Sequence, residues 1–168
     1  MSKKNKNRIC IIGMPGSGKS TIGSLLSEKL QYKFIDLDNE IEINTGLKIK
    51  EIFRNRGEDS FRKLETATLK ELIDKDNVVI STGGGTILKN EEILKKSYNI
   101  FLNCDLSELI KRASRNKNRP LLSSNVESKM KDLFNERKDL YNKIADLKID
   151  ASTNITKTVK HILNSLEL

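Results

Sequence analysis

A glycine-rich run between an apolar segment and a helical one constrains this chain more than any other feature. The run reads Gly13-Met14-Pro15-Gly16-Ser17-Gly18-Lys19-Ser20 and matches the pattern GxxxxGK[ST] in full. It follows the β-branched segment Arg8–Ile12 and precedes Lys19–Leu30, where apolar residues recur at helical spacing. A strand, a curled loop and a helix N-terminus in this order direct backbone N–H groups at phosphate oxygens. The sequence therefore predicts a phosphate-binding α/β fold.

This loop predicts a site for a nucleoside triphosphate with Mg²⁺. Lys19 would reach the β- and γ-phosphates, and the Ser20 hydroxyl would bind the metal. The alternative, a glycine-rich turn with a chance lysine, leaves the flanking strand and helix unexplained. The residues expected to contact the nucleotide here are Pro15, Gly16, Ser17, Gly18, Lys19, Ser20 and Thr21.

The rest of the chain narrows the class of nucleotide-binding protein. A GTPase switch needs a DxxG stretch and an NKxD stretch, and Asn116-Lys117-Asn118-Arg119 lacks the Asp that would read guanine. A motor ATPase needs more than 168 residues. A short chain with arginines in a late loop fits a small-molecule kinase better.

Segments of strand and helix pattern alternate along the chain, which favours a parallel sheet covered by helices on both faces. The strands are expected at Arg8–Ile12, Lys33–Ile35, Val78–Ser81, Asn99–Leu102 and Leu147–Ile149. The helices are expected at Lys19–Leu30, Asp38–Asn44, Ile49–Arg54, Phe61–Asp74, Glu91–Lys96, Leu106–Ser114, Val126–Ala145 and Ile155–Leu166, with a polar loop at Arg115–Asn125.

Composition bears on partners and compartment. Lys and Arg number 31 against 23 Asp and Glu, a net charge of +8, which suits anionic ligands. The lysines are dispersed rather than gathered in a stripe, so no nucleic-acid partner is expected. No apolar run approaches membrane-spanning length, and the first residues lack the apolar core of a signal peptide. Cys10 and Cys104 stand in strand-like runs and are expected to be buried thiols, consistent with a cytoplasmic protein.

Four further motifs stand in order after the phosphate loop, and with it they make the chain resemble the shikimate kinase family from about Arg8 to His161. They are Phe34-Ile35-Asp36-Leu37-Asp38; Ile49-Lys50-Glu51-Ile52-Phe53 leading to Gly57-Glu58-Asp59-Ser60-Phe61-Arg62-Lys63-Leu64-Glu65; Ser81-Thr82-Gly83-Gly84-Gly85; and Arg119-Pro120-Leu121-Leu122 followed by Glu136-Arg137 and Leu140-Tyr141.

The resemblance implies a fold and a reaction. The fold is like that of nucleoside monophosphate kinases: a three-layer α/β sandwich with a five-stranded parallel sheet. One domain spans residues 1–168, with a substrate-binding segment at about 38–65 and a mobile lid at about 113–125. The reaction transfers the γ-phosphoryl group of ATP to shikimate, giving shikimate 3-phosphate and ADP, with Mg²⁺ as cofactor. A monomer is expected.

Two carboxylates, Asp36 and Asp38, follow the second strand. In an extended chain their i, i+2 spacing places both on one face, toward the crevice beyond the strand ends. The resemblance implies that Asp36 holds Mg²⁺-bound water and that Asp38 binds the substrate hydroxyls and accepts a proton. The alternative is that Asp38 only caps the helix starting at Asn39.

The resemblance also assigns the remaining side chains. Arg62 and Arg137 would hold the substrate carboxylate, because a planar guanidinium grips a carboxylate with two parallel hydrogen bonds; Glu65 would orient Arg62. An ordinary surface ion pair between Arg62 and Glu65 is the alternative. Three glycines in a row, Gly83 to Gly85, cost chain entropy with no packing return, so close approach of the backbone to a ligand is expected there. A flexible turn between strand and helix is the alternative.

Three residues complete the expected nucleotide site. Arg119, in the late polar loop, would close over the phosphates as a catalytic group, and Arg112 would stack on adenine. A solvated basic loop is the alternative for Arg119. The loop after the last strand lacks the family's basic residue or proline, which leaves Asn154 as the adenine contact. The competing functions are a gluconate kinase of the same fold, a non-catalytic relative, and a nucleic-acid-binding P-loop protein.

Overall fold

The computed structural model describes residues 4–115 and 125–167, and a five-stranded parallel sheet forms its centre. The strands lie in the order β2-β3-β1-β4-β5, and all four neighbouring pairs run parallel. This confirms the predicted fold class. The strands are β1 Arg8–Ile12, β2 Lys33–Asp36, β3 Val78–Ser81, β4 Tyr98–Asn103 and β5 Leu147–Asp150.

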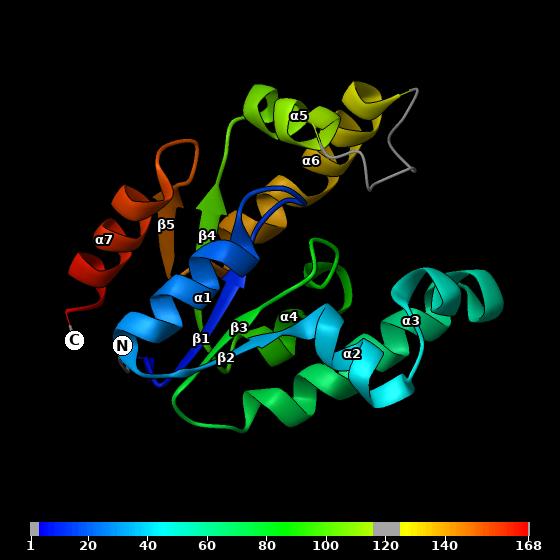
Figure 1. The fold of residues 1–168 in the computed structure, drawn as a ribbon, viewed down its shortest axis with the longest axis horizontal. Coiled ribbons are helices and arrows are strands. Elements are labelled where there is room, and N and C mark those ends of the chain that lie inside the picture. Colours follow the sequence, from blue (N-terminus) through cyan, green and yellow to red (C-terminus); the bar gives the residue numbers. More distant parts are fainter. Residues whose placement is uncertain (1–3, 116–124, 168) are drawn as a thin grey trace.

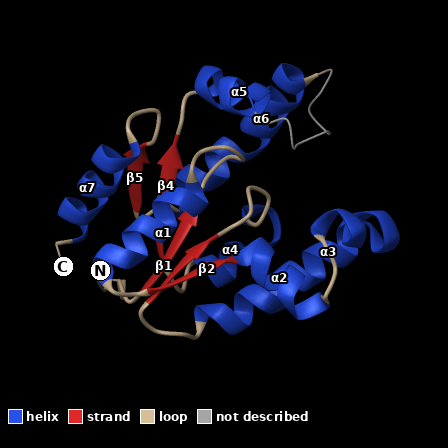
Figure 2. Cartoon of the chain, in the orientation of Figure 1, coloured by secondary structure: helices blue, strands red, loops and turns tan. Residues whose placement is uncertain are grey.

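Helices cover both faces of the sheet (Figures 1 and 2). One face packs against α1 and α7, and the other against α3, α4 and α6. The helices are α1 Lys19–Leu30, α2 Leu37–Thr45, α3 Ile49–Ile73, α4 Ile87–Leu94, α5 Leu106–Arg115, α6 Val126–Ile144 and α7 Ile155–Leu166.

The strand β1 shows why the central strands are apolar throughout. Ile9 and Ile11 pack in the cluster under α1 and α7, whereas Cys10 and Ile12 pack in the cluster on the opposite face. Both faces of a covered parallel sheet exclude water, so alternation of polar and apolar residues disappears. The thiols of Cys10 and Cys104 are free and buried, as predicted.

The two helices predicted at Ile49–Arg54 and Phe61–Asp74 lie in one kinked helix, α3, and the residues predicted as a loop between them are helical except at Gly57. The helix α3 runs from Ile49 to Ile73, and its one non-helical residue is Gly57, with φ 78° and ψ 172°. The residues around Gly57 are exposed on both sides of the kink. Without a buried face they carry no apolar periodicity, and the sequence therefore looked like a loop there.

The prediction for α4 was placed too late. The helix begins at Ile87, one residue after the glycine run, and ends at Leu94 rather than Lys96. Ile87 and Leu94 are both buried in the core. The start of the helix was not recognised from the sequence because the glycines before it favour a turn. Among the described residues, no helix has the length and apolar character to cross a membrane.

Candidate active site

The phosphate loop lies between β1, the middle strand of the sheet, and α1. Its position matches the crevice beyond the carboxyl ends of parallel strands, where such sheets bind ligands. Gly16 and Gly18 have φ of 82° and 93°, values that L side chains rarely adopt. Gly18 is the N-cap of α1, and Thr21 lies exposed on the first turn of that helix. The loop therefore presents backbone N–H groups at a helix N-terminus.

Lys19 is largely buried and is held by the loop itself. Its ammonium donates to the carbonyl oxygens of Gly13, at 2.9 Å, and Met14, at 2.8 Å. These bonds fix a positive charge at the mouth of the loop before any ligand arrives. Such preorganisation favours an anion over a neutral ligand.

Ser20 and Asp36 meet at this loop, as the sequence suggested. The Ser20 hydroxyl donates to Asp36 Oδ2 at 2.6 Å and lies 3.3 Å from the Ser81 hydroxyl. Mg²⁺ takes oxygen ligands and keeps several waters, so one hydroxyl, one carboxylate and a phosphate suit it. The residues present therefore fit the implied metal. In the described part of the chain, no group of three or more His, Cys, Asp or Glu could hold a metal on its own.

The geometry of the two carboxylates corrects the sequence prediction. Asp36 ends β2 in extended conformation, but Asp38 already stands in the first turn of α2, so the extended i, i+2 spacing does not apply. The helix cap is Asp36, whose Oδ1 accepts from the Asn39 N–H at 3.1 Å. The capping alternative for Asp38 is therefore wrong.

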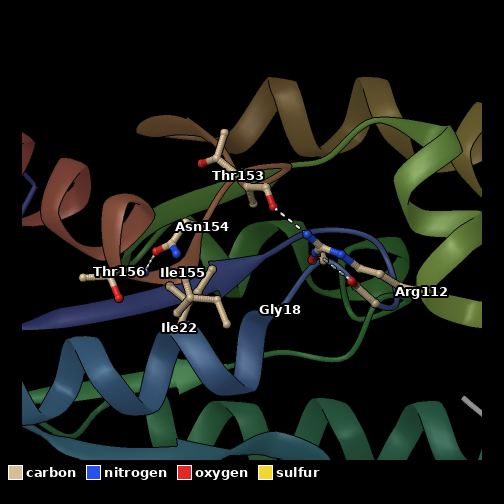
Figure 3. A pocket seen from close by; sticks show the side chains of 10 residues that line it. Gly18, Ile22, Arg112, Thr153, Asn154, Ile155 and Thr156 are labelled. Carbon is tan, nitrogen blue, oxygen red and sulfur yellow. Dashed lines mark hydrogen bonds between the residues drawn. The ribbon is translucent and has the colours of Figure 1, made fainter. Parts of the chain in front are cut away.

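A second part of the site is a cavity of about 650 Å³ beside the phosphate loop (Figure 3). Arg112 crosses from α5, donating to the carbonyl oxygens of Gly16 at 3.2 Å and Ala151 at 3.1 Å. Asn154 caps α7 by accepting from the Thr156 N–H at 2.8 Å. Arg112 and Asn154 thus line one cavity, and their contact with the base of the nucleotide stays a prediction. The lining residues are Gly16, Ser17, Gly18, Ile22, Arg112, Ala151, Thr153, Asn154, Ile155 and Thr156.

The glycine run after β3 is packed against other side chains, contrary to the expectation that it gives no packing return. A Cβ on Gly84 would lie 2.7 Å from the Pro15 ring, and one on Gly85 would lie 2.4 Å from Arg62 Nη2. A Cβ on Gly83 would meet Asp38 Oδ1 at 3.3 Å. The run is therefore a junction between the phosphate loop and the groups predicted to bind substrate.

Arg62 and Glu65 form a buried pair, which removes the alternative of a surface ion pair. Arg62 Nη1 donates to Glu65 Oε1 at 2.9 Å, and the two side chains are 14% and 1% exposed. Arg62 Nη2 also lies 3.4 Å from Glu58 Oε1. The ion pair holds the Arg62 guanidinium against Gly85, and part of the guanidinium remains accessible to a ligand.

Asp38 is the most perturbed acid of the site. Burial raises its pKa to about 6, and the negative charges of Asp36 and Glu65 reinforce the shift against Lys19 and Arg62. Its Oδ1 is buried and has no hydrogen-bond partner among the described residues. A carboxylate of this kind can accept a hydrogen bond or a proton from a ligand hydroxyl near neutral pH.

Arg137 lies on α6, and its positive charge complements the negative charge of Asp38. It is buried, and its Nε has no hydrogen-bond partner in the described part of the chain; the nearest carboxylate, of Glu136, is 3.7 Å away. One turn later, Tyr141 is in hydrogen-bond contact with Arg137 and donates to the Gly84 carbonyl oxygen at 2.5 Å. Burial raises the pKa of Tyr141 to about 12, which keeps this donor protonated. Through Tyr141, Arg137 is tied to the glycine run.

Sequence reasoning assigned no role to Tyr141 or Ser81. The i, i+4 spacing from Arg137 places Tyr141 on the same face of α6 and could have suggested it. Ser81 pairs with Asp36 across β2 and β3, and that register depends on a strand order that one sequence does not reveal. Arg119 lies outside the described residues, as does most of the predicted lid.

Known proteins resemble the chain over nearly its full length. A shikimate kinase from Aquifex aeolicus is 44% identical over 164 residues, covering 95% of this chain and 96% of its own. The solved structure of shikimate kinase from Acinetobacter baumannii, in complex with shikimate, has a TM-score of 0.89 and 37% identity, covering 98% of this chain and 94% of its own.

A gluconokinase from Sinorhizobium meliloti has a TM-score of 0.66 at 18% identity, covering 98% of this chain and 94% of its own, and shows the shared fold alone. The family model of shikimate kinase matches residues 15–167. The fold, the order of the motifs and these relatives agree: the chain belongs to the shikimate kinase family.

Proposed function

We propose that this chain transfers the γ-phosphoryl group of ATP to the 3-hydroxyl of shikimate, giving shikimate 3-phosphate and ADP for aromatic amino acid biosynthesis. One observation carries the proposal beyond family membership. Within the described part of the chain, Asp38 Oδ1 and Arg137 Nε are both buried without a hydrogen-bond partner; Asp38 lies close to Gly83, and Arg137 is linked to Gly84 through Tyr141. A buried acceptor and a buried charged donor are costly unless a ligand satisfies them. A small cyclic carboxylic acid that carries hydroxyl groups offers a hydrogen-bond donor to Asp38 and an acceptor to Arg137.

The phosphate loop would bind the nucleotide. Its N–H groups and Lys19 would bind the β- and γ-phosphates, and Ser20 and Asp36 would hold Mg²⁺ directly or through water. When bound, the metal supplies charge neutralisation on the phosphates. Arg112 and Asn154 would contact the base in the cavity beside the loop. Arg119 is proposed from the family resemblance to add positive charge to the transferring group.

Asp38, Arg62 and Arg137 would bind the substrate that accepts the phosphoryl group. Arg62 and Arg137 would hold the carboxylate and so fix the ring, while the N–H groups of Gly83, Gly84 and Gly85 would contact the substrate. Asp38 would then accept the hydrogen bond, and finally the proton, of the hydroxyl that attacks the phosphorus. Its pKa of about 6 leaves it deprotonated at neutral pH while raising its basicity.

The remaining expectations concern the molecule rather than its site. A monomer in the cytoplasm, with no nucleic-acid partner, stays a prediction. So does the single domain with a substrate-binding segment near residues 38–65 and a lid near 113–125.

A coupled assay of ADP release tests the function against its nearest rival. The protein is mixed with ATP and Mg²⁺ and given shikimate, gluconate or no acceptor. We expect ADP release to depend on shikimate and to stay at background with gluconate. Equal release with both acceptors would contradict the proposal, and Lys19→Ala, which removes the loop ammonium, is the control for contaminating kinases.

A further inference from the structure

Thr86 stands at the N-cap of α4 but does not cap it. Threonine at this position ordinarily accepts a hydrogen bond from the first turn of its helix. Here the side chain makes no cap hydrogen bond, and its hydroxyl instead donates to Glu65 Oε2 at 2.8 Å. Thr86 is itself 1% exposed. Its hydroxyl is therefore directed away from its own helix and at a buried carboxylate.

The two oxygens of that carboxylate have different partners. Oε1 accepts from Arg62 Nη1 at 2.9 Å, and Oε2 accepts from Thr86. The residue Glu65 is 0% exposed, so water cannot replace a missing donor. Both oxygens together fix the plane of the carboxylate, and this plane sets the direction in which Arg62 presents its guanidinium.

The Thr86 hydroxyl, Glu65 and Asp38 all border the space beside Gly83. A Cβ on Gly83 would be 3.2 Å from Thr86 Oγ1, 3.3 Å from Glu65 Oε2 and 3.3 Å from Asp38 Oδ1. A hydroxyl has one proton to donate, and in this geometry Glu65 receives it. Among the described residues, Asp38 Oδ1 is an acceptor without a hydrogen-bond partner.

Hydrogen bonds to α3 also keep Thr86 in place. Asn90 Nδ2 donates to the Thr86 carbonyl oxygen at 3.0 Å, and Thr66 Oγ1 donates to Asn90 Oδ1 at 2.7 Å. Thr66 and Glu65 are neighbours on α3. The start of α4 is therefore fixed relative to the helix that carries Arg62.

We propose that Thr86 is a positioning residue: its hydroxyl orients Glu65, which in turn aims Arg62 at the substrate carboxylate. The inference rests on the proposed function, in which Arg62 binds that carboxylate. It assigns Thr86 no contact with the substrate. The effect of losing the hydroxyl should therefore depend on whether the ligand has a carboxylate.

The test compares Thr86→Val, which keeps the shape and loses the hydroxyl, with Thr86→Ser, which keeps the hydroxyl. Each variant is assayed with shikimate and with the analogue in which a hydroxymethyl group replaces the carboxylate. We expect Thr86→Val to raise the KM for shikimate about tenfold to a hundredfold, the range for a hydrogen bond to a charged group. The KM for ATP and the KM for the analogue should stay within about twofold, and Thr86→Ser should restore the KM for shikimate.

The matched control is Thr66→Val, which removes a hydroxyl of the same network that does not contact Glu65. Because Thr66 acts on Thr86 only through Asn90, Thr66→Val should raise the KM for shikimate much less than Thr86→Val does. An equal rise for shikimate and the analogue in Thr86→Val, or no rise for either, would overturn the inference. If neither Thr86→Val nor Thr86→Ala folds while Thr86→Ser does, the hydroxyl serves folding and the positioning role is wrong.

Arg62→Lys and the assay of ADP release separate this inference from the proposed function. If Arg62→Lys leaves the KM for shikimate unchanged, the carboxylate role of Arg62 fails and the Thr86 inference with it, whereas the proposed function fails only if ADP release does not depend on shikimate. If Arg62→Lys raises that KM while Thr86→Val does not, only the role of Thr86 fails.

Discussion

At the scale of single residues, Asp38 combines a catalytic benefit with a cost to stability. Burial, Asp36 and Glu65 together raise its pKa from 3.8 to about 6. The same desolvation that makes the carboxylate a better base makes its charged form unfavourable in the folded protein. Function and stability therefore place opposite demands on this side chain.

The first prediction concerns catalysis by Asp38→Asn. The amide keeps the shape but cannot accept a proton, so we expect kcat to fall by about 10²- to 10⁴-fold, the usual range for a general base. The Kd for ATP should change little. In the wild type, kcat/KM should rise with pH through about 6 and then level off, because only deprotonated Asp38 accepts the proton. A kcat within a few-fold of the wild type would make Asp38 a positioning group only.

The same variant should be more stable at neutral pH. An acid whose pKa is higher in the folded chain than in the unfolded chain binds its proton preferentially when folded, so stability falls as pH rises from 3.8 to about 6. Asparagine stays neutral and avoids this loss. We expect Asp38→Asn to raise the free energy of unfolding by about 3 kcal/mol above pH 7, and by less than about 1 kcal/mol near pH 4. Urea unfolding at both pH values measures the difference, and a gain that is equal at both would contradict it.

Arg62→Lys gives the second residue-scale prediction. Lysine keeps the charge but loses the planar fork that matches a carboxylate. Shikimate binding should weaken by about 1–3 kcal/mol, the value of a hydrogen bond to a charged group, while ATP binding stays unchanged. Calorimetry with each ligand measures the two affinities. Equal weakening of both would place Arg62 in general packing rather than in substrate binding.

At the scale of elements, the glycine run after β3 separates the two halves of the site. Gly84 packs on the Pro15 ring of the phosphate loop, and Gly85 packs on the guanidinium of Arg62. None of Gly83, Gly84 and Gly85 has a positive φ. The requirement for glycine here comes from close approach rather than from backbone conformation.

A pair of alanine variants tests this division. Gly84→Ala places a methyl group 2.7 Å from a rigid ring, so the phosphate loop must shift, and we expect a higher KM for ATP and a lower Tm. Gly85→Ala meets the end of a flexible side chain, 2.4 Å away, so Arg62 moves. We expect that variant to raise mainly the KM for shikimate and to keep its Tm. The reverse pattern of KM changes would show that the run does not divide the site in this way.

The elements also show where a single sequence is informative. β1, α1 and α7 were predicted with the bounds that the structure has, because strong apolar patterns and clear boundary residues mark them. The start of α4 was missed, because glycines next to Ile87 signal a turn whether or not a helix follows. The two parts of α3 were predicted, but the helical residues on either side of the kink at Gly57 were missed because they have no buried face to produce a pattern.

At the scale of the whole molecule, the phosphate loop is local in sequence and the substrate half of the site is not. Gly13 to Ser20 form one loop, so their chemistry is visible in one motif. Asp38, Arg62, Gly84 and Arg137 come from four separate segments that only the fold brings to one junction. The family resemblance indicated these residues from the sequence. It did not indicate which of their atoms are buried without a partner among the described residues, nor the proposed role of Thr86. Those depend on packing between α3, α4 and α6.

The measurement that tests the central claim most directly is the identity of the product. The protein is incubated with ATP, Mg²⁺ and shikimate, ADP is quantified, and phosphorus–proton correlation NMR locates the new phosphate. We predict one ADP for each phosphorylated shikimate, with the phosphorus coupled to the proton on carbon 3. ADP formed without phosphorylated shikimate, or phosphate on another hydroxyl, would contradict the account of how Asp38 and the two arginines place the acceptor.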